Sequence, residues 1–302
     1  MKLEMISRSC PICKTEKYGE LFAKENFDLN RLNEFGFASR KTPEYMHYKL
    51  VSCKNCDLLY ASELPKDSFL EVAYHQAAFD SANEAKLASV TYSDFLKKEL
   101  NKLSSREGAL DIGTGDGVFL ERLLESGFTN VQGVEPSQAP IDSAKPHIKK
   151  LIKIGFFKAD DFTKNSLSLV SCFQTLEHVS EPLEICKEAV SLLKRGGCAF
   201  FVVHNRRALS AKILGKKSPI FDIEHLQLFS VRSAKKLLNE AGLSDVRVEK
   251  IYNNYPLNYW LKLFPFPSFM KPMILKTVRL LRLESVLITI PAGNLAVIGY
   301  KN

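Results

Sequence analysis

The stretch Ala109-Leu-Asp-Ile-Gly-Thr-Gly-Asp-Gly-Val-Phe119, followed by Val131-Gln-Gly-Val-Glu135, decides the fold. Three glycines at alternate positions after a short apolar run predict a strand over 108–112 that turns sharply into a helix over 118–126. The loop leaves no side chain in the way of a ligand, and the first N–H groups of the helix suit a polar or anionic group. Glu135 ends the next apolar run about 20 residues later, where a carboxylate can accept hydrogen bonds from ribose hydroxyls. The pattern predicts a nucleotide cradle.

The order Asp-x-Gly-x-Gly-x-Gly differs from the dinucleotide fingerprint, which places its final glycine three residues after the middle one. It resembles motif I of the class I S-adenosylmethionine-dependent methyltransferases. The resemblance implies an α/β fold with a seven-stranded Rossmann-like sheet. It also implies that Asp111 helps to hold the methionine end of S-adenosylmethionine and that Glu135 holds its ribose. The cofactor loop would then be formed by Gly113, Thr114, Gly115 and Gly117.

A second match to the same family follows the strand predicted at 167–173. The sequence Leu176-Glu-His-Val179 has the family's usual spelling, with an acid and a proline close behind. The resemblance implies that Glu177 and His178 lie beside the methyl group of the cofactor. The alternative is that Glu177 only caps the following helix and that His178 only packs the loop.

Two further cofactor contacts are implied by the resemblance. An acid followed by a bulky apolar residue contacts the adenine in this family, and here that pair is Asp161 and Phe162, with Asp160 as the alternative acid. Gln174, which opens the stretch after the 167–173 strand, is counted with the cofactor-binding residues.

Methyl transfer from a sulfonium requires an aligned nucleophile and, for a weakly acidic one, a base that removes its proton. The candidates are His178, His204 and the pair Glu224-His225. We favour His225, because its stretch Asp-x-Glu-His-x-x-x-Phe-Ser resembles the Glu-His motif of deoxysugar C-methyltransferases. In those enzymes the pair lies over the sugar and helps to remove a proton next to a carbonyl, and Glu224 would hold the imidazole. The alternative is a structural histidine that anchors the loop.

Four of the seven cysteines form two Cys-x-x-Cys pairs near the N-terminus. Such pairs place two sulfurs at one point, and two pairs supply the four thiolates of a closed tetrahedral zinc site. A closed site has no open position for catalysis, so we expect a structural metal, with redox thiols as the alternative. The predicted ligands are Cys10, Cys13, Cys53 and Cys56.

The chain divides into a predicted zinc-binding lobe at 1–64 and a methyltransferase domain at 65–302. The segment 24–45 between the cysteine pairs could reach the substrate or cover the zinc. Helical periodicity covers 65–104, with Tyr74-His75-Gln76 expected in a loop that either lids the cofactor or is a surface turn.

In the C-terminal part, a helix over 231–241 is predicted to be capped by Ser230. Strands are predicted at 198–204, 246–252 and 295–300, and the last resembles the family's antiparallel edge strand. An apolar and basic insertion at 253–294 carries a second helical pattern at 273–283. It could bind a membrane surface, cover a lipid-linked substrate, form a dimer contact through 255–283 or pack into the core.

At 302 residues, with 45% hydrophobic and 25% charged residues, the chain has the composition of an ordinary globular protein. The first residues lack the apolar core of a signal peptide, which predicts a cytoplasmic protein. The net charge of +8 favours anionic partners without choosing among them.

Three functions are consistent with this sequence. The favoured one is O- or C-methylation of a small hydroxylated or carbonyl acceptor, most plainly a sugar nucleotide or a polysaccharide intermediate. Deoxysugar C-methyltransferases carry a further C-terminal domain that this chain lacks, so O-methylation is a strong competitor. The alternatives are an RNA methyltransferase, disfavoured because the basic residues are dispersed, and an inactive cofactor-binding adaptor.

Overall fold

A computed structural model describes residues 4–28, 37, 44–77, 79, 82–264, 266–267 and 269–302. Most of the predicted segment between the cysteine pairs therefore lies outside the described residues. Among these residues, no helix has the length and the apolar character that crossing a membrane requires.

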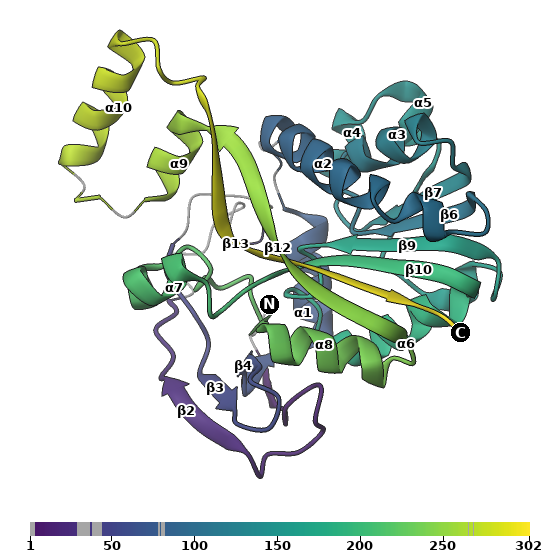
Figure 1. Cartoon of the computed structure of the whole chain (residues 1–302). Helices are drawn as coiled ribbons and strands as arrows, with labels where there is room; N and C mark the ends of the chain where they lie inside the picture. The colour runs from purple at the N-terminus through teal and green to yellow at the C-terminus, as the bar shows by residue number, and fades with distance from the viewer. Residues whose placement is uncertain are drawn as a thin grey trace.

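A seven-stranded sheet forms the centre of the molecule, as the glycine loop predicts (Figure 1). Its spatial order is β12-β13-β10-β9-β6-β7-β8, and β6 to β10 run parallel. The strands are β6 (Glu107–Ile112), β7 (Thr129–Glu135), β8 (Ile152–Ile154), β9 (Leu167–Phe173), β10 (Leu193–His204), β12 (Ser244–Pro256) and β13 (Leu287–Tyr300).

The last strand, β13, is antiparallel to both of its neighbours, as predicted, but it is not at the edge. It lies between β10 and β12, and β12 is the edge strand. The backbone of β13 is paired on both sides, and its side chains from Leu295 to Ile298 are almost fully buried because helices cover both faces of the sheet. The expectation of an edge position is therefore corrected.

Helices cover both faces of the sheet. The helices α2 and α3 contact each other, as do α6 and α8, and in Figure 1 the two pairs lie on opposite sides of the strands. These four helices are α2 (Ala82–Lys97), α3 (Val118–Glu125), α6 (Pro182–Leu192) and α8 (Val231–Glu240). Shorter turns complete the domain at α4 (Gln138–Ser143), α5 (Pro146–Lys149), η2 (Leu100–Lys102) and η3 (Ala159–Asp161).

Two local predictions have different outcomes. Ser230 caps α8 as expected: its side chain accepts the Ser233 N–H, and the Ser233 hydroxyl accepts the Ser230 N–H. Tyr74 and His75, however, are not in a loop, because they form the last turn of helix α1 (Asp67–His75), and only Gln76 lies beyond it.

The N-terminal lobe is built on two small sheets. Strands β1 (Met5–Ser7) and β5 (Glu63–Pro65) pair, and β3 (Leu50–Cys53) and β4 (Leu59–Ala61) form a hairpin around the second cysteine pair. Strand β2 (Gly19–Ala23) pairs with β3, and β11 (Gln227–Leu228) pairs with β4. Because β11 belongs to the C-terminal half of the chain, the lobe and the main domain share a sheet.

The C-terminal strands are longer than predicted and carry the insertion away from the body. Before Asn294, from Leu287 on, β13 pairs only with β12, so the two strands leave the sheet as a ribbon. Its end bears α9 (Leu257–Leu263) and α10 (Met270–Leu280), which project from the main domain (Figure 1). The segment 205–217, which follows β10, contains the helical turns α7 (Leu209–Leu214) and η4 (Gly215–Lys217).

Candidate functional site

The glycine loop joins β6 to α3 at the carboxyl edge of the sheet. Gly113 has a φ of +74°, and a Cβ there would lie 2.2 Å from the Thr175 hydroxyl oxygen, so only glycine fits. Gly115 has a φ of +59°, and no atom lies within 4 Å of where its Cβ would be. The loop is therefore packed from below at Gly113 and open above at Gly115, which leaves room for a ligand on the open side.

Glu135 lies at the end of β7 and is held against this loop. Its carboxylate accepts the Gly115 N–H at 2.8 Å and the Ser137 N–H at 2.9 Å. Burial raises the pKa of Glu135 to about 7, although the two backbone N–H groups oppose that rise. The carboxylate is thus placed to accept further hydrogen bonds from a ligand at the loop.

Asp111 lies within β6 just before the loop and is 2% exposed. Its carboxylate accepts the Ser171 hydroxyl at 2.6 Å, and burial raises its pKa to about 6. The Thr114 hydroxyl is also buried, and it has no hydrogen-bond partner among the residues that the structure describes. A polar group of a ligand would satisfy this hydroxyl.

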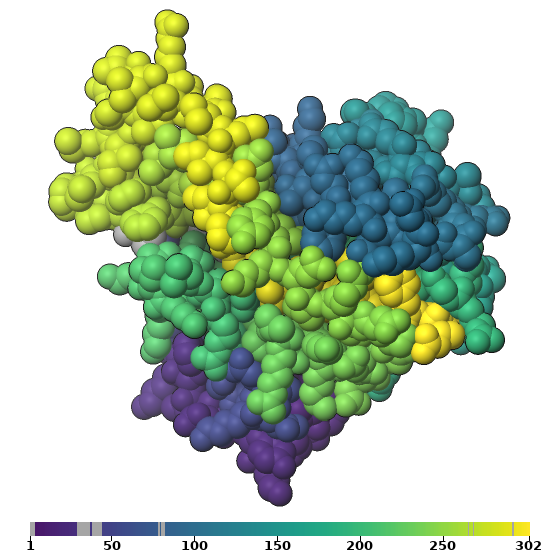
Figure 2. Space-filling model, in the orientation of Figure 1, coloured from purple at the N-terminus to yellow at the C-terminus, as the bar shows by residue number. Residues whose placement is uncertain are grey.

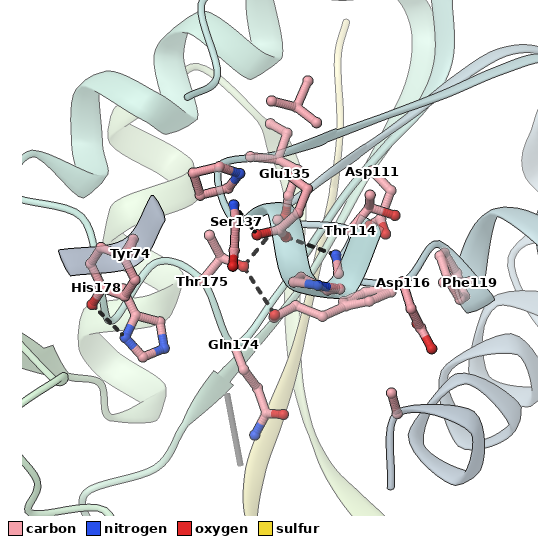
Figure 3. A pocket seen from close by; sticks show the side chains of 18 of the residues that line it. Tyr74, Asp111, Thr114, Asp116, Phe119, Glu135, Ser137, Gln174, Thr175 and His178 are labelled. Carbon is pink, nitrogen blue, oxygen red and sulfur yellow. Dashed lines mark hydrogen bonds between the residues drawn. The ribbon is translucent and has the colours of Figure 1, made fainter. Parts of the chain in front are cut away.

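A cavity of about 240 Å³ opens above the loop. Figure 3 shows Asp111, Thr114 and Asp116 on one side of it and Tyr74 and His178 on the other, with Gln174 between them. Its walls are mostly apolar and aromatic, which suits a flat heterocycle, and its polar groups gather at the loop and at the histidine. Aromatic wall residues that the sequence patterns missed are Phe37, Phe79, Tyr92, Phe156, Phe157 and Phe173.

Three residues predicted to bind the cofactor do not line this cavity. Gly117 is instead the N-cap residue of helix α3. The turn η3 directs Asp161 to Lys153, whose Nζ lies 2.7 Å from the carboxylate. Phe162 stacks on Phe157 from outside, with ring centroids 6.1 Å apart, and it is Phe157 that faces the cavity. The other predicted positions, Asp111, Gly113, Thr114, Gly115, Glu135 and Gln174, all line it.

The three candidate histidines form one group above the carboxyl edge. The His225 ring lies 5.1 Å from the His178 ring and 4.9 Å from the His204 ring. Only His178 lines the cavity, and His225 lies behind it. Glu224 lines the cavity as well, and its carboxylate is 3.7 Å from His225 Nε2.

The protonation of His178 follows from its partners. Its Nδ1 is 3.0 Å from the Glu224 carbonyl oxygen, which can only accept, so Nδ1 carries the proton of the neutral ring. Nε2 is then the basic nitrogen. The Tyr74 hydroxyl lies 3.1 Å from the same Nδ1 and 3.2 Å from the same carbonyl, which fixes the ring from a second side.

Glu177 is fully buried and does not cap the following helix, whose N-cap residue is Glu181. One of its oxygens accepts the His204 backbone N–H. Burial raises the pKa of Glu177 to about 8, so the group is mostly protonated at neutral pH. Its backbone carbonyl accepts the Leu226 N–H at 2.8 Å. Glu177 therefore ties the loop after β9 to β10 and to the segment after Glu224.

The four predicted zinc ligands meet in the N-terminal lobe. Their sulfurs all lie within 4.8 Å of one another, with Cys10 and Cys56 at 3.6 Å and Cys13 and Cys53 at 3.9 Å. A tetrahedral site with Zn–S bonds of about 2.3 Å separates its sulfurs by about 3.8 Å, which fits. Among the described residues this is the one group that could hold a metal ion.

The two cysteine turns repeat the same backbone geometry. The Lys14 N–H donates to the Cys10 carbonyl and the Asp57 N–H to the Cys53 carbonyl, both at 2.7 Å. Lys14 and Asp57 both have positive φ, 52° and 61°. Each turn therefore presents its two sulfurs in the same way, as zinc knuckles do.

Comparison with known proteins connects this geometry to a family. Residues 84–248, more than half of the chain, match the family described as the methyltransferase domain. The ubiquinone biosynthesis O-methyltransferase of Vibrio parahaemolyticus is 29% identical over 167 residues, 51% of this chain and 70% of that protein. The protein of the same name from Actinobacillus pleuropneumoniae is 30% identical over 123 residues, 37% of this chain and 52% of that protein. Among solved structures, the YcgJ protein of Bacillus subtilis has a TM-score of 0.50 at 14% identity, covers 70% of this chain and 97% of its own, and shares the fold.

Proposed function

The chain belongs to the methyltransferase-domain family and is an S-adenosylmethionine-dependent methyltransferase; from this premise we propose that it methylates a hydroxyl group of a small-molecule acceptor. The relatives named as O-methyltransferases support a hydroxyl acceptor. The observation that carries the proposal is that one cavity joins the glycine loop to a histidine with a basic nitrogen.

The cofactor half of the cavity is assigned to the loop and the ends of β6 and β7. Bound S-adenosylmethionine would supply an electrophilic methyl group. Glu135 would accept hydrogen bonds from the ribose hydroxyls, and Asp111 would hold the methionine end. The buried Thr114 hydroxyl and the open space above Gly115 support this assignment, because both suit a ligand lying across the loop.

The acceptor half is assigned to the histidine side. Methyl transfer would join the methyl carbon to the acceptor oxygen in place of the sulfur of the cofactor, and the hydroxyl proton would go to Nε2 of His178. The Glu224 carbonyl would stabilise the doubly protonated ring, because it accepts a hydrogen bond from Nδ1–H before and after the transfer. His225, the base favoured from the sequence, lies behind His178, and in this proposal it packs and orients that ring.

A His178→Ala change tests this assignment. General-base catalysis contributes about 10²- to 10⁴-fold, so we expect kcat to fall within that range while the affinity for S-adenosylhomocysteine stays unchanged. The assay is transfer of labelled methyl from S-adenosylmethionine to a panel of phenols, catechols and sugar nucleotides. The matched control is His225→Ala, for which we expect a smaller loss. A larger fall in kcat in His225→Ala than in His178→Ala would show that His225, and not His178, is the base.

The same panel tests the acceptor class. A phenolic or other hydroxylated acceptor is expected to turn over. The deoxysugar resemblance implies a saccharide acceptor and C-methylation, and both stay predictions. Methylation of a sugar nucleotide in this assay would establish the saccharide acceptor in place of the phenolic one. RNA added as an acceptor is expected to remain unmethylated.

For the lobe, proposed at 1–64, we infer a structural zinc ion bound by Cys10, Cys13, Cys53 and Cys56. The spacing of the four sulfurs supports it. Four thiolates leave no open coordination position, so the ion would hold the two turns together and would not contact the acceptor.

A further inference from the structure

The end of the insertion, residues 257–286, forms a separate projection that is called the arm here. Among the described residues, the contacts that hold it lie at its base. Tyr255 is buried, and its ring packs 4.8 Å from Tyr259 and 5.3 Å from Trp260. The indole N–H of Trp260 donates to the Ile288 carbonyl at 2.9 Å. The ribbon and α9 are therefore fixed, and the arm has a defined position.

Beyond that base, none of the described residues of α9 and α10 is buried. No residue of α10 is buried, so the expectation that this helical pattern packs into the core is wrong for α10. Figure 2 shows the arm projecting from one corner of the molecule. Its large apolar side chains are exposed to an extent that is rare for a helix of a globular protein. The most exposed are Phe269 at 73%, Met273 at 68%, Leu280 at 82% and Leu281 at 59%.

The charge of the arm is almost entirely positive. It carries five basic residues, Lys262, Lys271, Lys276, Arg279 and Arg282, and one acidic residue, Glu284. Arg279 forms an ion pair with Glu284 at 3.3 Å, and its side chain is 78% exposed. Exposed apolar side chains among unbalanced basic ones are the composition of helices that lie in the interface of an anionic membrane.

Helix α7, which contacts β13, also exposes apolar side chains beside basic ones. Leu209 and Ile213 lie four residues apart, on one face of this helix, and are 72% and 73% exposed. Lys212, Lys216 and Lys217 accompany them, and all three are exposed. Helix α7 and the arm thus both expose aliphatic side chains together with basic side chains.

We propose that the arm docks the enzyme on the surface of a membrane that contains anionic lipids. The aliphatic side chains would enter the headgroup boundary, and the basic side chains would contact lipid phosphates. A second copy of the chain fits less well, because a two-fold contact between arms would bring like charges together. Nucleic acid would attract the charges but would leave the leucines and methionines in water. The inference does not depend on which acceptor is methylated.

Flotation of the full chain with vesicles tests the proposal. We expect binding to vesicles of phosphatidylcholine mixed with phosphatidylglycerol, weaker binding to phosphatidylcholine alone, and release by salt. Each basic residue near an anionic surface strengthens binding by about fivefold, so Lys276→Gln, Arg279→Gln and Arg282→Gln together should weaken it about 100-fold. The control carries the same loss of charge at the exposed residues Lys150→Gln, Lys158→Gln and Lys164→Gln and should bind like wild type.

A second variant tests the apolar contribution. Met273→Gln with Leu280→Gln removes two exposed side chains, so the midpoint of thermal unfolding should not change, while vesicle binding falls. Equal vesicle binding by wild type and both arm variants would overturn the proposal. The proposal would also be overturned if wild type did not bind the anionic vesicles. Two further results would overturn it: a dimer of the wild type that the arm variants do not form, or binding of RNA, instead of vesicles, that depends on the arm.

Discussion

Two features of its surroundings shift the pKa of the Glu135 carboxyl group in opposite directions. Burial favours its neutral form, and the N–H groups of Gly115 and Ser137 favour the ionised form. Burial has the larger effect, and the pKa is raised to about 7. Because the pKa of Glu135 is higher in the folded than in the unfolded protein, protonated Glu135 favours the folded state. In the ligand-free protein this contribution to the free energy of unfolding is fully present below the usual pKa of 4.5 and is lost as the pH rises through about 7. A ligand that donates hydrogen bonds to the ionised carboxylate would lower the pKa of Glu135 and so oppose the effect of burial.

This opposition predicts a pH dependence of cofactor binding. If ribose hydroxyls donate to ionised Glu135, the affinity for S-adenosylhomocysteine should rise by up to about tenfold per pH unit up to pH ~7 and level off above it. Asp111, with its pKa raised to about 6, acts in the same direction at lower pH. Calorimetric titration between pH 5.5 and 8.5 measures the effect.

Glu135→Gln is the matched control for this titration, because the amide keeps the size of the side chain but cannot ionise. Its affinity should be lower than that of wild type at pH 8, and the step near pH 7 should be absent. An unchanged step in this variant would remove Glu135 from the cofactor site.

Single residues of the cofactor loop could be predicted because their signal is local in the sequence. Gly113, Gly115 and Glu135 lie within one strand–loop–strand unit, and the structure brings them together at the cavity. Phe157 lines the cavity too, but nothing in its neighbourhood in the sequence indicates that. Its place depends on the turn η3 and on packing against Phe162, which only the folded chain determines.

Among the elements, the N-terminal lobe contacts the acceptor side of the cavity through the shared β4–β11 pairing and through the side chain of Arg8. The Arg8 guanidinium donates to the carbonyls of Ala61, Ser180 and Leu226, at 2.8, 2.6 and 2.6 Å. Burial lowers the pKa of Arg8 to about 10, and the group stays charged at neutral pH. Ser180 and Leu226 each follow a segment that carries a candidate histidine, so the lobe supports the position of both.

Loss of the proposed zinc ion should therefore affect more than the lobe. We expect Cys53→Ser to bind less than one zinc ion per chain, to unfold at a temperature lower by about 5 °C or more, and to lose turnover more than affinity for S-adenosylhomocysteine. Metal analysis, thermal unfolding and the methyl-transfer assay measure the three effects.

Cys186→Ser is the control for this change. Cys186 is also buried, but it lies on α6 outside the cysteine group, so this variant should keep its zinc. Equal metal content in the two variants, or none in the wild type purified without added metal, would contradict the zinc assignment.

Elements with a strong local pattern were predicted closely, and those that depend on partners were not. Strand β9 has the predicted bounds, and α8 begins at its predicted cap. The strands β12 and β13 continue well beyond the predicted ends because each satisfies the backbone of the other outside the sheet. The position of β13 between two strands also could not be predicted, since it follows from the pairing order.

At the scale of the whole molecule, three parts of the chain have separate tasks in this account. The sheet carries the cofactor loop, the N-terminal lobe supports the histidine side, and the arm extends away from both (Figure 1). The sequence predicted the fold class and the cysteine group, because each rests on a spaced motif. It left the arm open among four alternatives, because exposure is a property of the folded chain and cannot be read from an amphipathic pattern.

The cavity above the glycine loop is the proposed binding site of S-adenosylmethionine. Gly115→Leu tests this claim, because the new side chain would fill space that contains no protein atom. Gly196→Leu is the matched control: Gly196 has a φ of +74° and equally open surroundings but does not line the cavity. In calorimetric titration with S-adenosylhomocysteine, wild type and Gly196→Leu should bind the ligand and Gly115→Leu should not. Equal binding by the two leucine variants, or no binding by wild type, would contradict the claim.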